Sequence, residues 1–178
     1  MHRLENLFFI GPTGAGKTTI GRRAASYFGF QFHDLDHAIE KQTGADVALI
    51  FEIEGETGFR KRESAMLDEL THKRGIVLAT GAGAILDPEN CRRLQSRGLV
   101  IYLQTGVERQ IERLGRDRRR PLLRTANRNE VLEKMANLRN PIYETVCDLS
   151  IPSDSVSVAV MARKVIRHIE QAKEDLAG

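Results

Sequence analysis

Short apolar runs recur along the chain, and several of them are apolar at every or nearly every position. Residues 7–10, 76–80 and 99–103 are of this kind, which is typical of strands in a parallel sheet covered on both faces. Two further strands are predicted at residues 31–34 and 147–151. Strands that alternate with helices indicate a three-layer α/β/α fold with a five-stranded parallel sheet.

Helix-forming segments separate these strands. A helix is predicted to begin after the cap pair Asp87-Pro88, and Pro141 is expected to kink or break a helix that begins near residue 129. Other helices are predicted over residues 17–28, 36–42, 46–54, 56–73 and 107–114. The closing helix has apolar residues with a 3.6-residue repeat, so we expect this stripe to face the core: Val158, Met161, Ala162, Val165, Ile166, Ile169, Ala172 and Leu176.

Length and composition predict a single domain over residues 1–178. With 41% hydrophobic residues, the chain can fill one core but has little room for two. Its apolar runs are far shorter than the ~18 residues of a membrane span, and no signal peptide is readable. We therefore expect a cytoplasmic protein without a membrane partner, whose two cysteines are buried thiols.

The positive charge is concentrated in one segment. Six arginines and one aspartate lie between residues 113 and 124, and their net +5 leaves −2 for the rest of a chain whose total is +3. A nucleic-acid-binding protein spreads basic residues over a face. A short basic segment without helical periodicity, predicted to be a mobile loop, instead favours a compact anionic ligand.

A glycine-rich loop follows the first predicted strand. Residues 11–18, GPTGAGKT, fit the pattern GxxxxGK[ST], and a predicted helix follows directly. Backbone N–H groups and the positive helix end bind phosphate in such loops. We expect Lys17 to contact the β- and γ-phosphates of a nucleoside triphosphate and Thr18 to ligate Mg²⁺. The expected nucleotide-binding residues of this loop are Gly14, Ala15, Gly16, Lys17, Thr18 and Thr19.

The loop alone does not specify the fate of the phosphate. No guanine-binding NKxD motif is present, and neither apolar strand at 76–80 nor 99–103 ends in a Walker-B aspartate. A small chain with an Arg-rich segment resembles P-loop kinases of the nucleoside-monophosphate-kinase-like type. In these proteins a lid, expected here at about residues 114–126, closes over ATP and excludes water.

Four further motifs make the chain similar to one family, shikimate kinase, over nearly its whole length. They are DLD at 34–36, FR at 59–60 with Glu63, GAG at 81–83, and the pair RPLL at 120–123 and RNPIY at 139–143. The resemblance implies transfer of the γ-phosphate of ATP to the 3-hydroxyl of shikimate, on the way to chorismate and aromatic amino acids. It also implies a shikimate-binding segment at about 34–63, and we expect a monomer.

The resemblance implies a role for each substrate residue. Arg60 and Arg139 match the pair that clamps the shikimate carboxylate, whose planar shape suits guanidinium groups. Asp36 matches the residue that accepts hydrogen bonds from the ring hydroxyls and is the candidate base. Asp34 is expected to hold Mg²⁺ through water, and Glu63, one helical turn from Arg60, to hold that side chain in place.

The turn at 81–83 departs from the family, which usually has three glycines there. Alanine in the middle still offers its backbone N–H, although it disfavours a positive φ. We therefore expect Gly81, Ala82 and Gly83 all to contact shikimate.

On the nucleotide side, the resemblance implies that Arg113 packs on adenine and that Arg120 in the lid contacts the ATP phosphates. With Lys17 and Asp36, Arg120 completes the expected catalytic set. Tyr143 and Phe59 are expected to be packing residues beside the site.

Other interpretations remain open. Asp36 could simply cap a helix, and Arg60 and Arg139 could form ordinary ion pairs. The alternative functions are a kinase of another polyol acid, such as gluconate, and a non-catalytic ATP-binding regulator. A zinc site at His33 and His37 is disfavoured, because a strand end and a turn separate them.

Overall fold

The computed structural model describes residues 5–115, 127–153 and 156–177. Of the lid predicted over about 114–126, residues 116–126, Arg120 included, lie outside the described residues. In chain order the elements are β1 (Leu7–Ile10), α1 (Lys17–Phe28), β2 (Gln31–Asp34), α2 (Leu35–Thr43), α3 (Val47–Thr71), β3 (Ile76–Ala79), the 3₁₀ helix η2 (Ala84–Leu86), α4 (Pro88–Arg97), β4 (Leu99–Gln104), α5 (Val107–Leu114), α6 (Arg128–Val146), β5 (Leu149–Pro152) and α7 (Val158–Ala177).

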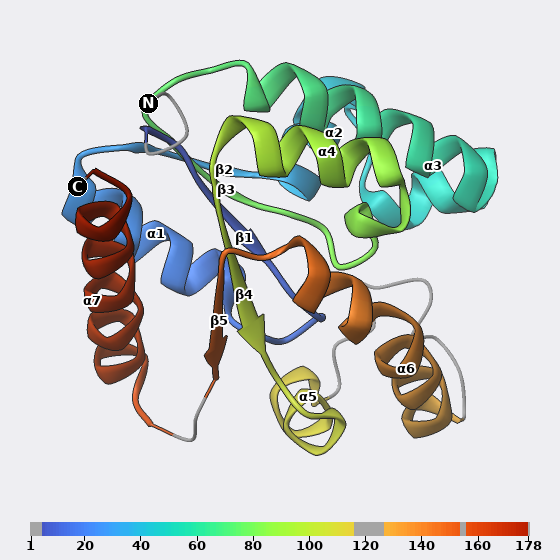
Figure 1. Ribbon diagram of the computed structural model, residues 1–178. Coiled ribbons are helices and arrows are strands. Elements are labelled where there is room, and N and C mark those ends of the chain that lie inside the picture. Colours follow the sequence, from blue (N-terminus) through green and yellow to red (C-terminus); the bar gives the residue numbers. More distant parts are fainter. Residues whose placement is uncertain (1–4, 116–126, 154–155, 178) are drawn as a thin grey trace.

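The five strands form one parallel sheet, as predicted, and their order is β2-β3-β1-β4-β5. Side chains alternate along the central strand β1. Leu7 and Phe9 pack in a core with α1 and α7, whereas Phe8 and Ile10 pack in a second core with α3, α4 and α6. Figure 1 shows these helices on the two sides of the sheet, so the fold has the predicted three layers.

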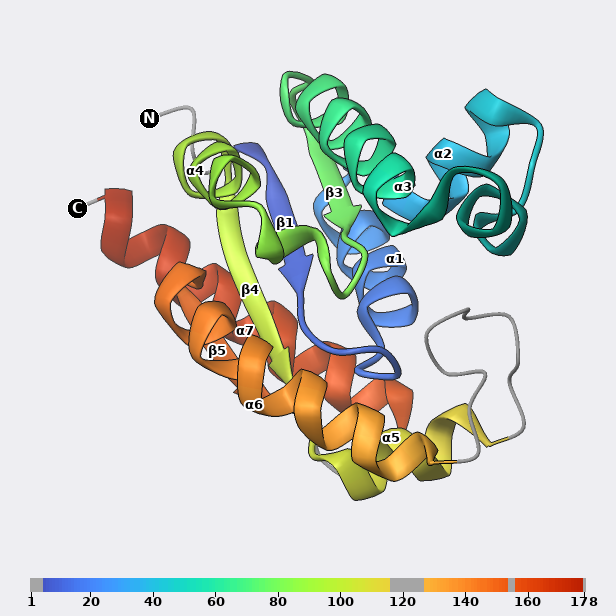
Figure 2. The same cartoon turned by 90° about the vertical axis from the view of Figure 1, so that its right-hand side faces the viewer.

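The carboxyl ends of parallel strands meet at one edge of the sheet, where ligands of such folds bind. The glycine-rich loop follows β1, Asp34 ends β2, and the turn at 81–83 follows β3. Figure 2 shows the loop after β1 between α1 and the α5–α6 pair. The topology therefore brings motifs that are far apart in the sequence to one place.

Two predictions about helices are wrong in part. Helix α6 continues through Pro141; the proline removes one backbone donor, but Leu132, Tyr143 and Val146 are buried on either side of it and hold the helix in place. In α7 the middle of the apolar stripe is buried, whereas Val158 is 44% exposed and Leu176 is 59% exposed. Only the middle of α7 packs on the sheet, so its ends have nothing to bury against.

The prediction of a helix break at Gly55 is confirmed as a kink. One helix is assigned across it, but Gly55 has the non-helical angles φ 70° and ψ −179°. Both cysteines are free thiols; Cys91 is buried, whereas Cys147 at the end of α6 is only partly buried, which corrects the expectation of two buried thiols. Among the described helices, none combines the length and the apolar character that a membrane crossing requires.

Candidate active site

The phosphate loop lies between β1 and α1. Gly11, Gly14 and Gly16 have φ of 142°, 80° and 92°, values that residues with side chains rarely adopt. Lys17 is almost fully buried, and its ammonium donates to the carbonyl oxygens of Gly11 at 2.7 Å and Pro12 at 2.8 Å. The loop therefore has the strained glycines and the anchored lysine of a phosphate site.

The hydroxyl of Thr18 and the carboxylate of Asp34 are in contact. Thr18 Oγ1 donates to Asp34 Oδ2 at 2.7 Å, while Asp34 Oδ1 accepts from the N–H of His37 and caps α2. Asp36 lies in the first turn of α2 and is not its cap, so the capping interpretation of Asp36 is wrong. A hydroxyl and a carboxylate oxygen are ligands that Mg²⁺ accepts together with water and phosphate oxygens, so this pair fits the metal.

No protein cage for a metal is present in the part of the chain that the structure describes, because no group of three or more His, Cys, Asp or Glu side chains could hold an ion there. Mg²⁺ bound to a nucleotide does not need such a cage, since phosphates and water complete its shell. The result also gives no support to a zinc site at His33 and His37.

The turn at 81–83 lies against the acidic and basic side chains of the site. A methyl group on Gly81 would lie 2.6 Å from Glu63 Oε2 and 3.1 Å from Asp36 Oδ1, and one on Gly83 would overlap the guanidinium of Arg60. Ala82 has a negative φ, as has every described residue other than glycine. Glycine is therefore required at 81 and 83 by close approach, while the middle position accommodates alanine without strain.

Glu63 is buried between charged groups. It is 1% exposed, and its Oε1 accepts from Arg60 Nη1 at 2.7 Å, which confirms the predicted contact. Arg60 also pairs with Glu56 at 3.3 Å. Burial, with a contribution from Asp36, raises the pKa of Glu63 to about 7, although Arg60 and Arg139 act in the opposite direction.

Arg139 is a buried cation on α6. Arg139 is 8% exposed, and its Nε has no hydrogen-bond partner among the described residues. Burial, together with the positive charge of Arg60, lowers its pKa. Within the described ranges no carboxylate lies at ion-pair distance from Arg139, so the ordinary ion-pair interpretation applies to Arg60 but not to Arg139. A buried cation of this kind is suited to binding an anion.

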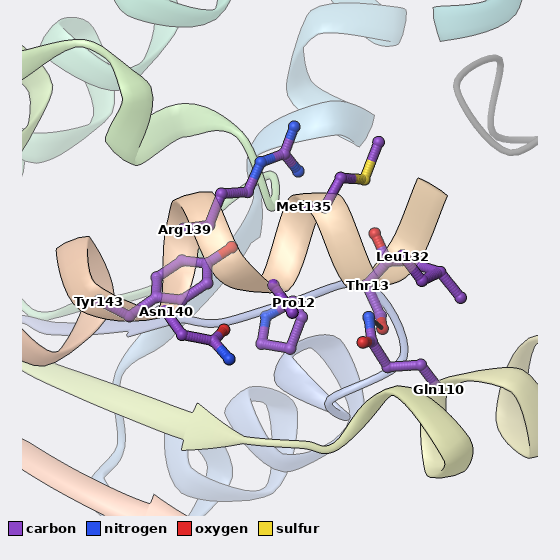
Figure 3. A pocket seen from close by; sticks show the side chains of 9 residues that line it. Pro12, Thr13, Gln110, Leu132, Met135, Arg139, Asn140 and Tyr143 are labelled. Carbon is purple, nitrogen blue, oxygen red and sulfur yellow. Dashed lines mark hydrogen bonds between the residues drawn. The ribbon is translucent and has the colours of Figure 1, made fainter. Parts of the chain in front are cut away.

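The hydroxyl of Tyr143 contributes a contact that sequence analysis missed. Tyr143 lies one turn after Arg139 and donates to the carbonyl oxygen of Ala82 at 2.5 Å, while its ring stacks on that of Tyr102 at 4.9 Å. Figure 3 shows the small pocket that Arg139 and Tyr143 share with Thr13 of the phosphate loop. Phe59 is buried, as expected of a packing residue.

Arg60 also lines an open cleft on the other side of the turn. The cleft has a volume of about 610 Å³ and is lined by Arg60, Glu63 and Gly83 together with residues of α3, η2 and the start of α4. This volume lies within the range of small-molecule sites. Arg60 therefore lines this cleft, whereas Arg139 lines the small pocket beside the phosphate loop.

On the nucleotide side, Arg113 lies directly against the phosphate loop. Its Nη1 donates to the carbonyl oxygen of Gly14 and to Ser153 Oγ, both at 2.9 Å. Gln110 and Ser153 also contact this loop, although no motif singles them out. The structure thus places most of the described candidate residues around one edge of the sheet, and their roles stay predictions.

Comparison with known proteins gives one family. The family model for shikimate kinase matches residues 13–170. Curated shikimate kinases from Vibrio campbellii and Actinobacillus succinogenes are 49% and 50% identical to the chain over 171 residues, which is 96% of this chain and 99% and 98% of theirs.

Solved structures agree. Shikimate kinase from Acinetobacter baumannii in complex with shikimate has a TM-score of 0.93 and 44% identity, covering 97% of this chain and 96% of that one. A shikimate kinase from Aquifex aeolicus has a TM-score of 0.79 and 28% identity, with coverage of 97% and 98%. A gluconokinase from Sinorhizobium meliloti, with a TM-score of 0.61 and 13% identity over 98% and 97%, shares the fold alone.

Proposed function

The chain belongs to the shikimate kinase family, and on that premise we propose how its residues perform the reaction. The enzyme uses ATP as co-substrate and phosphorylates the 3-hydroxyl of shikimate, giving shikimate 3-phosphate and ADP in the pathway towards chorismate and the aromatic amino acids. The assignment of roles to individual residues is the proposal.

Arg139 and Arg60 bind the shikimate carboxylate. The observation that carries this assignment is the buried guanidinium of Arg139, whose Nε has no partner, beside an Arg60 already held by Glu63. A carboxylate between the two guanidinium groups accepts charge-assisted hydrogen bonds from both. The hydroxyl groups on the ring then lie towards Asp36 and the backbone of residues 81–83, which accept from and donate to them.

The phosphate loop binds the triphosphate of ATP through residues 14–19, with Lys17 leaving the loop carbonyls to contact the β- and γ-phosphates. Thr18 and Asp34, already in contact, hold Mg²⁺, Thr18 directly and Asp34 through water. The metal supplies positive charge that neutralises the phosphate oxygens. Arg113 packs on adenine with the face of its guanidinium, because its hydrogen bonds to Gly14 and Ser153 use only the edge.

In the transfer step the 3-hydroxyl oxygen forms a bond to the γ-phosphorus as the bond from that phosphorus to the β–γ bridging oxygen breaks. The electron pair of the broken bond leaves with ADP, and the hydroxyl proton passes to Asp36. In a loose transition state this proton leaves late, so Asp36 chiefly orients the hydroxyl. Arg120 and the lid at 114–126 keep the roles that the resemblance implies: charge stabilisation and exclusion of water.

Asp36→Asn tests this assignment. The amide has no negative charge, so it orients the hydroxyl less firmly towards the γ-phosphorus and also cannot take its proton. We therefore expect kcat to fall on the order of a hundredfold or more while the KM for shikimate changes by less than about fivefold. Asp175→Asn is the matched control, because Asp175 is exposed on α7, a helix that contributes no residue to the candidate site. An Asp36→Asn enzyme with an unchanged kcat would remove Asp36 from the chemistry.

We further propose that the enzyme is a single-domain monomer in the cytoplasm. The phosphate loop, Asp34 and the turn at 81–83 follow neighbouring strands of one sheet, an arrangement that supports a site built within one copy of the chain. A supply of ATP and two free thiols, Cys91 and Cys147, fit a reducing compartment.

A further inference from the structure

Five consecutive carbonyl groups of the phosphate loop, from residue 11 to residue 15, each accept a hydrogen bond from a side chain. Lys17, inside the loop, takes the first two. The next three are taken by side chains from outside the loop, on α5 and just after β5. Side chains on elements without a recognised phosphate-binding motif therefore hydrogen-bond to the carbonyl groups of the loop.

Gln110 makes the most enclosed of these contacts. Its Nε2 donates to the carbonyl oxygen of Thr13 at 2.9 Å, and the residue is only 3% exposed. Figure 3 shows its side chain beside Thr13 at the foot of the pocket. Helix α5 packs directly on the loop here, since a methyl group on Gly14 would lie 3.8 Å from the Cα of Gln110 and 3.6 Å from Leu114 Cγ.

Ser153 makes the corresponding contact from the other side. Its Oγ donates to the carbonyl oxygen of Ala15 at 3.2 Å and accepts from Arg113. Ser153 is 8% exposed. Arg113, which donates to the carbonyl oxygen of Gly14, therefore joins Ser153 to α5, the helix that also carries Gln110.

The direction of a carbonyl sets the direction of the next N–H. In a planar trans peptide the C=O and N–H groups point in opposite directions, so holding the carbonyls of Thr13 and Ala15 outward turns the N–H groups of Gly14 and Gly16 inward. These peptides end on glycines, whose φ rotates at little cost. Without an outside donor, a carbonyl could turn inward and present its negative end to the phosphates.

We propose that Gln110 and Ser153 are positioning residues for the triphosphate. They contact the phosphate loop rather than ATP, and they act by fixing two peptide groups in the orientation that binds phosphate. The proposal rests on the proposed function, because it requires the loop to bind ATP. A neutral amide suits this task, since it donates to a carbonyl without adding charge beside Arg139, which lines the same pocket.

Gln110→Met tests the proposal, because it keeps the length of the side chain and removes the donor. We expect the dissociation constants of Mg·ATP and of inorganic tripolyphosphate to rise together by about tenfold, the size of one buried hydrogen bond. Tripolyphosphate has no adenine, so a weaker binding of tripolyphosphate reports on the phosphate loop and not on the contact between Arg113 and adenine. The dissociation constant of shikimate and kcat at saturating ATP should stay within about twofold.

Glu108→Gln is the matched control, since Glu108 is exposed on the same helix and contacts no loop carbonyl among the described residues; its affinities should equal those of the wild type. Ser153→Ala is a milder second variant that removes a donor from a different element. We expect it to weaken tripolyphosphate by about threefold, and it keeps the test valid if Gln110→Met fails to fold.

Unchanged tripolyphosphate affinity in Ser153→Ala and in a folded Gln110→Met would overturn the proposal. So would an equal loss of shikimate and tripolyphosphate affinity, because that pattern indicates a merely structural role. A wild-type protein that binds neither Mg·ATP nor tripolyphosphate would instead overturn the proposed function itself, so the two failures are distinguishable.

Discussion

Burial of the Arg139 guanidinium costs free energy because the charge loses its contact with water, and a bound anion would offset that cost. Burial lowers the pKa of Arg139, and its Nε has no partner. Arg139→Ala removes the charge-assisted contact to the shikimate carboxylate, so we expect the KM for shikimate to rise on the order of a hundredfold. The KM for ATP should change less than about threefold, as measured by initial rates with each substrate varied.

Lys134→Ala is the control for this variant, because Lys134 is exposed on the same helix. It should behave as wild type in both substrates. A near-normal KM for shikimate in Arg139→Ala would contradict the carboxylate clamp.

The turn at 81–83 allows a comparison of three neighbouring positions. Ala82→Gly, which restores the usual family residue, should leave the KM for shikimate within about twofold, since no strain is relieved. Gly81→Ala must displace Glu63 or Asp36, and Gly83→Ala must displace Arg60. Both should raise that KM at least about tenfold, with smaller effects on the melting temperature because flexible side-chain ends move aside.

Equal effects at all three positions, measured by steady-state kinetics and thermal unfolding, would show that close approach does not explain the pattern Gly-Ala-Gly.

Glu63 makes stability depend on pH. Its folded pKa of about 7 lies above its ordinary 4.5, so between these values the folded protein keeps a proton that the unfolded chain releases. Its contribution to stability is therefore complete below about pH 4.5 and is lost as pH rises through 7. The change amounts to about 3 kcal/mol at most.

Urea denaturation of wild type and Glu63→Gln from pH 5 to pH 8 measures this contribution. Comparison with the variant cancels other groups, such as His33, whose pKa is lowered by burial. The stability of wild type relative to the variant should fall up to about pH 7 and then level off. A difference independent of pH would contradict the assignment.

At the scale of elements, the hydroxyl of Tyr143 connects α6 to the turn after β3. Tyr143→Phe removes the donor to the Ala82 carbonyl and leaves that buried acceptor unsatisfied, at a cost of about 1–2 kcal/mol. Without this hydrogen bond the position of Arg139 relative to Ala82 is less well fixed, so the KM for shikimate should rise several-fold.

Tyr102→Phe is the matched control for Tyr143→Phe, since its hydroxyl makes only a 3.4 Å contact with Asn140 Oδ1. Thermal unfolding and shikimate kinetics should separate the two variants. Equal effects would mean that ring stacking, and not the hydroxyl, connects the elements.

The elements themselves were largely predictable, because β1, β3 and β4 consist almost wholly of buried apolar residues and several helices have a local signal at one end. Asp87 caps α4 and Gly29 ends α1 as expected. Pro141 and the ends of α7 were not predictable, because they depend on what packs against the helix. The sequence of a helix shows which of its faces is apolar, but it does not show how much of that face the sheet covers.

At the scale of the whole molecule, the parallel sheet explains why separate motifs form one site. The phosphate loop, Asp34 and the turn at 81–83 follow three neighbouring strands, and this could be predicted once the strands were identified. The contacts of Gln110, Ser153 and Tyr143 could not. They join positions 97, 138 and 61 residues apart. A single glutamine, serine or tyrosine that belongs to no motif gives no indication in the sequence of the residue it will contact.

The proposed monomer is tested by sedimentation. The mass in solution should be about that of one chain, 20.0 kDa, with and without ATP and shikimate. A stable dimer whose dissociation abolishes activity would contradict a site completed within one chain.

Shikimate-dependent release of ADP from Mg·ATP tests the central claim most directly. With purified protein in a coupled assay, shikimate should stimulate ADP release strongly, and gluconate at the same concentration should not. Stimulation by gluconate equal to or greater than that by shikimate, or ATP binding without stimulation by shikimate, would contradict the account.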